Sequence, residues 1–261
     1  MMKRPACFGP QYASAFQEPS VADAYAFRPP YPPAVFDVLR KLLPATPQRL
    51  LDVGCGTGAL TRQLTRLAIP IDAIDISPVM IAHGKDLPNG SNALIHWVVG
   101  AVETTPFTPP YDLITAGESL HWMDWEAVLP RFAAILAPHG RLVILELGYQ
   151  ALPWSEQLGL LIQRYSTNRD YQAVDLITEL EQLQLFRAEG RTETPPWIFR
   201  QSVDDYIESF HGRASFARER MAIKDARAFD LQLRELVTAH THGMVEQALI
   251  ATIVWGKPLL Q

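Results

Sequence analysis

The chain has 261 residues, of which 23 are Lys or Arg and 28 are Asp or Glu, so its formal net charge is −5. Its content of 48% hydrophobic and 20% charged residues predicts a globular protein with one large core and argues against intrinsic disorder. The acidic balance excludes a basic surface that coats nucleic acid.

The N-terminus and the cysteines bear on the cellular compartment. Two basic residues are followed by Pro5, Gly9 and Pro10 in place of an apolar run, and no apolar window reaches about 18 residues. Cys7 and Cys55 are too few for a disulfide framework, and a metal site would need clustered ligands. We therefore expect a cytoplasmic protein without a metal, a membrane partner or a nucleic-acid partner. Monomer and homodimer both stay open.

Short apolar runs alternate with segments of helical spacing along the first 150 residues. Residues 59–68 and 125–136 space their apolar side chains three and four apart, as helices between parallel strands do. The alternation predicts an α/β fold built on one open, mostly parallel sheet covered by helices. The predicted strands span residues 49–53, 71–75, 95–99, 111–116 and 141–147.

Beyond residue 150 the pattern is mostly helical. Residues 155–165, 173–183 and 203–240 read as helices, and only residues 248–255 read as a strand. This part of the chain predicts a helical cap.

The most informative stretch is LLDVGCGTGAL at residues 50–60, a strand that leads into three alternating glycines and then a helical pattern. Alternating glycines let a ligand lie against the main chain, where a Cβ would collide. Free N–H groups at the start of the next helix favour a polar or anionic ligand group. Asp75 ends the next predicted strand, where a carboxylate can accept hydrogen bonds from both ribose hydroxyls of an adenosine. The alternative is a turn without a ligand.

The glycine spacing separates two adenosine cofactors. Nicotinamide cofactors need G-x-G-x-x-G, whereas this loop has G-x-G-x-G with Ala59 and Leu60 after it, which serves a pyrophosphate poorly. The stretch LLDVGCGTG resembles the glycine-rich motif of the class I S-adenosylmethionine-dependent methyltransferases, and the resemblance extends over most of the chain. An NAD(P)-dependent oxidoreductase is the alternative.

This resemblance implies a Rossmann-like sheet of seven strands, mostly parallel with an antiparallel last strand, helices on both faces, and S-adenosyl-L-methionine as the cofactor. It gives the ribose to Asp75 and places the segment after the third strand beside the adenine ring, although Ala101 stands where many members carry an Asp. The implied cofactor-binding residues are Asp52, Gly54, Cys55, Gly56, Gly58, Asp75, Ile76, Ala101, Val102 and Ala116.

We divide the chain into three parts on these grounds. Residues 1–45 form an N-terminal lid segment, and residues 46–150 form the S-adenosylmethionine-binding core. Residues 151–261 complete the core, with a helical cap at about 202–243 and the last strand at about 248–256.

A narrower resemblance involves the N-terminal segment and the loop after the fourth strand. Phe16, Ala22, Tyr25 and the run RPPYP at 28–32, together with His121-Trp122, look like the small-molecule branch that includes the trans-aconitate methyltransferases. We therefore predict methyl transfer to a small molecule, either a carboxylic acid or a hydroxylated metabolite. A non-catalytic S-adenosylmethionine-binding protein is a further alternative.

In-line methyl transfer needs a well-positioned acceptor, without a metal or a covalent intermediate. His121 could act as a base or hold a carboxylate, and its structural alternative is to orient Trp122. Arg28 could pair with a carboxylate of the cofactor or substrate, or form a salt bridge that pins the N-terminal segment. Tyr25 could pack against the sulfonium or be an ordinary buried aromatic residue. We expect Glu118, Trp122 and Trp125 to line the same pocket wall, unless the tryptophans are core residues.

The predicted helical segment 203–240 carries three arginines. Arg213, Arg218 and Arg220 could meet an anionic acceptor or form a solvated basic face. The apolar side chains of this segment are expected to pack the cap.

Overall fold

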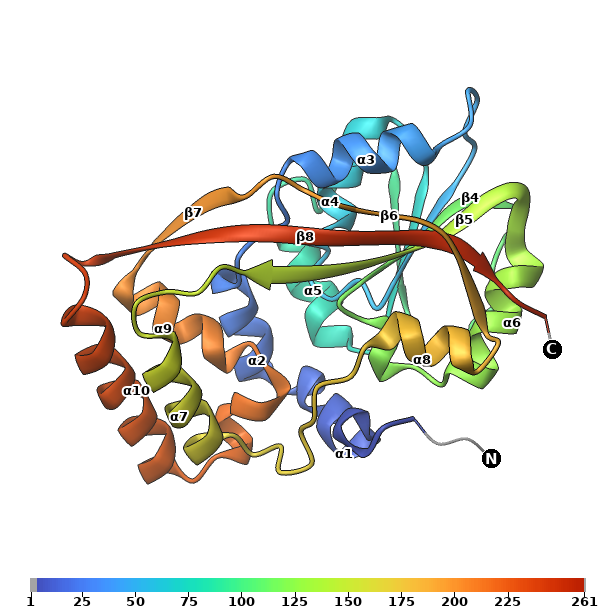
Figure 1. Ribbon diagram of the computed structural model, residues 1–261. Coiled ribbons are helices and arrows are strands. Elements are labelled where there is room, and N and C mark those ends of the chain that lie inside the picture. The colour runs from blue at the N-terminus through green and yellow to red at the C-terminus, as the bar shows by residue number, and fades with distance from the viewer. Residues whose placement is uncertain (1–3, 261) are drawn as a thin grey trace.

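A mixed, eight-stranded sheet forms the centre of the molecule in the computed structural model, which describes residues 4–260 (Figure 1). The strand order is β3-β2-β1-β4-β5-β8-β6, and β7 also pairs with β8. The strands from β3 to β5 run parallel, whereas β8 is antiparallel to β5, β6 and β7. The strands are β1 (Leu50–Val53), β2 (Ile71–Asp75), β3 (Ile95–Val99), β4 (Tyr111–Gly117), β5 (Leu136–Tyr149), β6 (Phe186–Glu193), β7 (Trp197–Ser202) and β8 (Met244–Pro258).

The inner strands are apolar because both faces of the sheet are covered. Every residue of β1 and β2 is buried, as expected for parallel strands between two helical layers. Successive side chains point to opposite faces, so Leu51 and Val53 join one hydrophobic cluster and Leu50 joins the other. The register pairs Leu50 with Ile71 on β2 and with Leu113 on β4.

Helices cover the two faces of the sheet, as the sequence predicts (Figure 1). On one face, α3 (Ala34–Leu42) and α4 (Thr61–Leu64) contribute to the cluster that contains Leu50. On the other face, α6 (Trp125–Ile135) and α8 (Leu176–Gln182) pack onto Leu51 and its neighbours. The α/β fold class is confirmed, with one strand more than the seven expected.

The helical cap has a core of its own. It consists of α7 (Ser155–Tyr165), α9 (Val203–His211) and α10 (Ile223–Thr238), which lie together at one end of the sheet (Figure 1). Phe210 and Phe229, with ring centroids 5.5 Å apart, lie in its apolar cluster. The predicted helix at 203–240 is therefore two helices, separated by the 3-10 turns Ala214–Phe216 and Arg218–Arg220.

The N-terminal segment is a chain of short helical turns beside the cap. It includes α1 (Pro10–Ala13), α2 (Pro19–Ala24) and the 3-10 helices η1 (Ala6–Phe8), η2 (Ser14–Gln17) and η3 (Tyr25–Phe27). The helices α2 and α9 are in contact, and α2 also contacts α5 (Pro78–Asp86) beside the parallel sheet. This segment thus joins the cap to the sheet.

Two expectations from the sequence are wrong. The strands β6 and β7 were not expected, because charged residues alternate along β6 with less exposed ones and the run has no apolar appearance. The helix expected at 59–68 is α-helical only from Thr61 to Leu64, continues as a 3-10 turn and ends where Ala68 adopts a φ of 58°. Within residues 4–260, no helix has the length and apolar character that crossing a membrane requires.

Candidate functional site

The glycine loop, residues 54–58, follows the end of β1 and has no side chain at three of its five positions. Gly54, Gly56 and Gly58 have φ values of +61°, +54° and +73°, in the left-handed region that favours glycine. A Cβ at Gly54 would lie 2.6 Å from the Cβ of Ser119. At Gly58 the space is filled by the ring of Trp97, which would lie 2.3 Å from an added Cβ. Gly54 and Gly56 line a cavity, whereas Gly58 does not, so the first two glycines are the ones that can face a ligand.

Asp75 lies beside this loop, at the end of β2. Its Oδ2 accepts the N–H of Gly56 and its Oδ1 accepts the N–H of Ser77, each at 2.8 Å. Burial raises the pKa of this carboxyl, and the two N–H donors oppose that rise. Because a carboxylate oxygen has two acceptor positions, each oxygen can still accept one more hydrogen bond. The backbone thus fixes the carboxylate in an orientation that leaves it available to a ligand.

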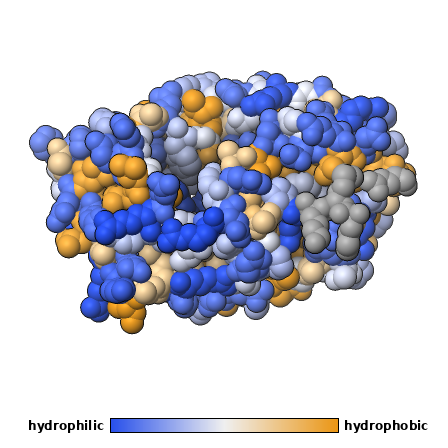
Figure 2. Space-filling model, turned by 60° about the horizontal axis from the view of Figure 1, so that its bottom comes forward, coloured by the Kyte–Doolittle hydropathy of each residue, from blue (hydrophilic) through white to orange (hydrophobic). Residues whose placement is uncertain are grey.

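A cavity of about 320 Å³ is lined by both the glycine loop and Asp75, and its size is typical of small-ligand sites. The molecule is hollowed near the middle of the face shown in Figure 2, where hydrophilic residues border the hollow. The residues expected from the sequence that line the cavity are Gly54, Gly56, Asp75, Ile76, Ala101, Val102, Tyr25, Glu118 and Trp122.

The N-terminal segment forms one wall of this cavity. Ala13, Ser14, Phe16 and Gln17 line it together with Tyr25. The ring of Phe16 lies edge-on to Trp122, with centroids 5.4 Å apart. Ala13, Ser14 and Gln17 could not be assigned to the site from the sequence, because turns of three to six residues show no periodicity that could place them.

The remaining residues expected to bind the cofactor do not line this cavity. Asp52 lies beneath the loop, where it accepts hydrogen bonds from the hydroxyls of Thr115, at 2.8 Å, and Thr61. Burial raises the pKa of Asp52 to about 6. Cys55 and Gly58 are not among the lining residues, and Ala116 lines a second cavity.

Arg28 and Glu118 form the charged part of the wall. Arg28 Nη2 lies 2.9 Å from Glu118 Oε2, and its guanidinium lies 5.3 Å from the ring centroid of Tyr25. Of the two alternatives for Arg28, the structure shows the salt bridge that pins the N-terminal segment. Glu118 has a φ of 51°, which is strained for a residue with a side chain. Such strain at the end of a strand is typical of functional sites.

His121 lies in η5 (Leu120–Trp122) and faces a second cavity of about 290 Å³, which Glu118 also lines. Its ring packs against Phe8 and Trp122, with centroids 4.7 and 4.8 Å away. Burial, aided by the positive charges of Arg28 and Arg4, lowers the pKa of His121 to about 4. The imidazole is therefore neutral at pH 7.

Trp125, expected on the pocket wall, lies in the core instead. It is buried, and its Nε1 donates a hydrogen bond to the carbonyl oxygen of Leu120 at 2.9 Å. It thereby fixes the turn that carries His121, as the core alternative for this tryptophan required.

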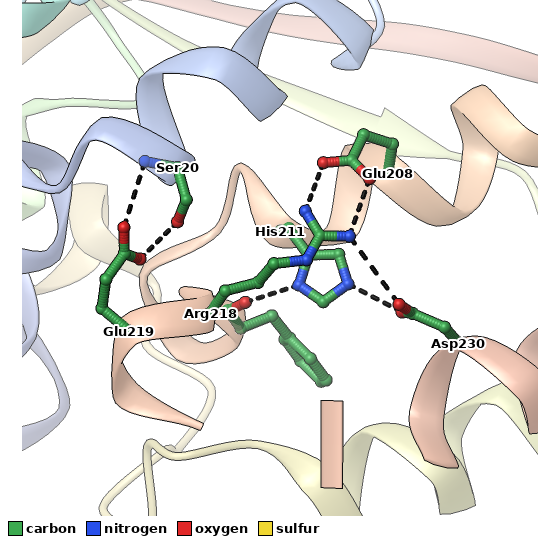
Figure 3. Close-up of polar contacts among 7 residues, drawn as sticks. Ser20, Glu208, His211, Arg218, Glu219 and Asp230 are labelled. Atoms are coloured by element: carbon green, nitrogen blue, oxygen red, sulfur yellow. Dashed lines mark hydrogen bonds and ion pairs between the residues drawn. The ribbon is translucent and has the colours of Figure 1, made fainter. Parts of the chain in front are cut away.

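A polar network ties the cap to the N-terminal segment (Figure 3). Arg218 Nη2 donates to Glu208 Oε2 at 2.8 Å, and His211 Nε2 lies 2.7 Å from Asp230 Oδ1. In the same region, the Ser20 backbone N–H on α2 donates to the Glu219 carboxylate at 3.2 Å. Arg220 is paired as well, with Glu18 at 3.5 Å and the Ser14 hydroxyl at 2.9 Å. Arg218 and Arg220 thus have structural partners within the protein.

Comparison with known proteins agrees with this geometry. Residues 51–144 match the model of the methyltransferase domain family. An uncharacterized methyltransferase of Mycobacterium tuberculosis is 32% identical over 139 residues, which cover 52% of this chain and 54% of the relative. A ubiquinone biosynthesis O-methyltransferase of Xylella fastidiosa is 32% identical over 115 residues, which cover 43% and 47% of the two chains. The chain thus matches about half the length of these relatives.

Solved structures share the fold at low sequence identity. A putative type II methyltransferase from Anaeromyxobacter dehalogenans has a TM-score of 0.62 at 20% identity, covering 90% of this chain and 99% of its own. An S-adenosylmethionine-dependent methyltransferase from Geobacter sulfurreducens, solved with S-adenosyl-L-homocysteine, has a TM-score of 0.51 at 16% identity, with coverages of 96% and 99%.

The fold and the glycine-loop cavity define a Rossmann-like domain for an adenosine cofactor. Residues 51–144 match a methyltransferase domain, and this part of the chain is similar to the class I S-adenosylmethionine-dependent methyltransferases. The cofactor of that class is S-adenosyl-L-methionine.

Proposed function

We propose that the protein transfers the methyl group of S-adenosylmethionine to a small molecule, either a carboxylic acid or a hydroxylated metabolite. One observation carries the proposal: a single cavity is lined by the bare loop at Gly54 and Gly56, by Asp75 and by Glu118. A cofactor site and a wall bearing charged groups therefore adjoin each other. The acidic balance of the chain supports a small acceptor over a nucleic acid.

The residues present fit the cofactor. Gly54 and Gly56 offer backbone that a side chain would block, and Asp75 keeps acceptor positions for ribose hydroxyls. Ile76 and Val102 offer apolar surface for the adenine ring. When bound, S-adenosylmethionine supplies an electrophilic methyl group on a sulfonium.

The chain itself contributes positioning and exclusion of water. Phe16, Tyr25 and Trp122 form the aromatic part of the cavity wall, and the Arg28–Glu118 pair holds the N-terminal segment against the end of β4. His121 faces the second cavity, which shares Glu118 with the cofactor cavity. Its neutral imidazole can accept a proton from a hydroxyl acceptor that reaches this second cavity, whereas a carboxylate acceptor needs no base. Holding the acceptor on the reaction axis is the main contribution of the protein to such a transfer.

Transfer of labelled methyl groups tests the proposal. The protein is incubated with S-adenosylmethionine labelled on its methyl group and with an extract of small metabolites. We expect a labelled small molecule to form in proportion to the amount of protein. Cofactor binding without any labelled product would favour the non-catalytic binding protein, and enhanced NADH fluorescence would favour the oxidoreductase.

A further inference from the structure

Arg213 differs in its lack of a polar partner from the other partly buried arginines within residues 4–260. Within residues 4–260, it is partly buried, and no hydrogen bond or ion pair with its guanidinium is found. Its guanidinium carbon lies over the ring of Phe210, 4.3 Å from the ring centroid. Every other arginine in this range that is at least partly buried has a polar partner, namely Arg4, Arg28, Arg49, Arg62, Arg131, Arg141, Arg218 and Arg220.

The charge around Arg213 is not balanced. The titratable groups with the largest effect on its charge are Tyr149, Arg28, Tyr206 and Glu118. Glu118 is the acidic group among them, and it is already paired with Arg28 at 2.9 Å. Burial lowers the pKa of Arg213, and the charge of Arg28 adds to this effect. A guanidinium still stays protonated at neutral pH, so one positive charge is left without a counter-ion among the described residues.

This charge lies next to the wall of the cofactor cavity. The neighbouring Gly212 packs closely against the Arg28 side chain, because a Cβ added at Gly212 would lie 3.2 Å from Arg28 Cγ. The turn after α9 therefore contacts Arg28. Arg28 in turn reaches Glu118, which lines the cavity. Tyr149 ends β5, at the same edge of the sheet as the end of β4. Open α/β sheets bind their ligands at this edge.

We propose that Arg213 binds an anionic group of the methyl acceptor, either a carboxylate or a phosphate monoester. The inference rests on the proposed function, and it selects acceptors that carry an acid. The planar guanidinium presents parallel N–H donors to two oxygens of either group. The Tyr149 and Tyr206 hydroxyls, whose charge would affect Arg213, are candidates to add hydrogen bonds to the same oxygens.

A structural role for Arg213 is the competing explanation. A cation close to the C-terminal end of α9 and over the Phe210 ring can stabilise the cap. Replacing Arg213 would then lower the stability of the protein. A purely structural role would not make binding depend on the charge of a ligand.

Calorimetry of the protein saturated with S-adenosylhomocysteine separates the two roles. Acetate, succinate, benzoate and glycerol 3-phosphate are titrated against their uncharged counterparts acetamide, succinamide, benzamide and glycerol. We expect at least one anion to bind the wild-type protein and its neutral counterpart not to bind. R213Q should weaken that anion about 10- to 100-fold, as for loss of a charged hydrogen bond, and R213K should restore part of the affinity.

The control is R227Q, which removes one positive charge from the exposed surface of α10. It should leave the affinity for the anion unchanged, and all variants should bind S-adenosylhomocysteine as the wild type does. Absence of anion binding to the wild type, or equal binding by R213Q, would overturn the role of Arg213. Failure of a bound anion to accept labelled methyl groups would instead count against the proposed function and leave the anion site in place.

Discussion

Arg28 of the N-terminal segment and Glu118 at the end of β4 lie 2.9 Å apart, and their side chains are 21% and 31% exposed. The pair joins segments 90 residues apart in the sequence. Glu118 also lines both cavities. Its backbone has a positive φ of 51° at this position. The N-terminal segment is therefore held by this salt bridge at the place where acceptor and cofactor are expected to meet.

A double-mutant cycle measures this pair. We expect R28M and E118Q each to lower the free energy of unfolding by about 1–2 kcal/mol, because each leaves a partly buried partner unsatisfied. The double variant should lose less than the sum of the two, with a coupling of about 1 kcal/mol in urea unfolding. Simple additivity would show that the two charges do not stabilise each other.

Gly56→Val should abolish cofactor binding. The residue has a φ of +54°, and its Cβ would point toward Tyr25 at 3.5 Å, on the lining of the cavity. A β-branched side chain is strained there and occupies ligand space. Gly159→Val in α7 is the matched control, because no atom lies within 4 Å of the Cβ position there. Calorimetry that finds equal affinity for S-adenosylhomocysteine in the wild type and G56V would contradict the assignment of the loop.

Asp75→Ala should weaken cofactor binding by about 1.5–3 kcal/mol, because the carboxylate that accepts the ribose hydroxyls is lost. That range corresponds to roughly a 10- to 150-fold higher Kd. Asp86→Ala, at the exposed end of α5, removes the same charge and should have no effect. Circular dichroism checks that both variants fold, and an unchanged Kd in D75A would place the ribose elsewhere.

The lowered pKa of His121 predicts how the free energy of unfolding changes with pH. Burial lowers its pKa to about 4, below the ordinary 6.5, so the unfolded chain binds a proton between these values and the folded protein does not. The stability that His121 contributes is complete above pH 6.5 and is lost as the pH falls toward 4. Urea unfolding should therefore depend less steeply on pH in this window for H121N than for the wild type. An imidazole NMR signal of His121 with a midpoint near 6.5 would refute this.

The inner part of the fold could be predicted because its elements are coded locally. The parallel strands β1, β2 and β4 are apolar runs bounded by Pro, Gly or polar residues, since helices cover them on both sides. The strands β6 and β7 pair with β8 at the outer side of the sheet, so their charged residues can face solvent. Their pairing depends on β8, whose partner residues lie 42 to 72 positions further along the chain, and no local signal marks it.

The candidate site also has a part that could be predicted from the sequence and a part that could not. The glycine loop and Asp75 could be predicted because their spacing reflects a strand, a turn and the next strand. The wall formed by Phe16 and Gln17, and the unpaired charge of Arg213 beside Arg28, arise from contacts between distant segments. Trp122 and Trp125 lie close together in the sequence, which does not distinguish a cavity-lining tryptophan from a core tryptophan. The packing of α6 against the sheet places Trp125 in the core, whereas Trp122 lines the cavity.

Calorimetric titration of the wild-type protein with S-adenosylhomocysteine tests the central claim most directly. The claim is that Gly54, Gly56 and Asp75 form the site of a sulfonium nucleoside. We predict saturable binding of one molecule per chain, lost in G56V and kept in G159V. A folded wild-type protein that releases no heat of binding, or a G56V variant that binds as the wild type does, would contradict it.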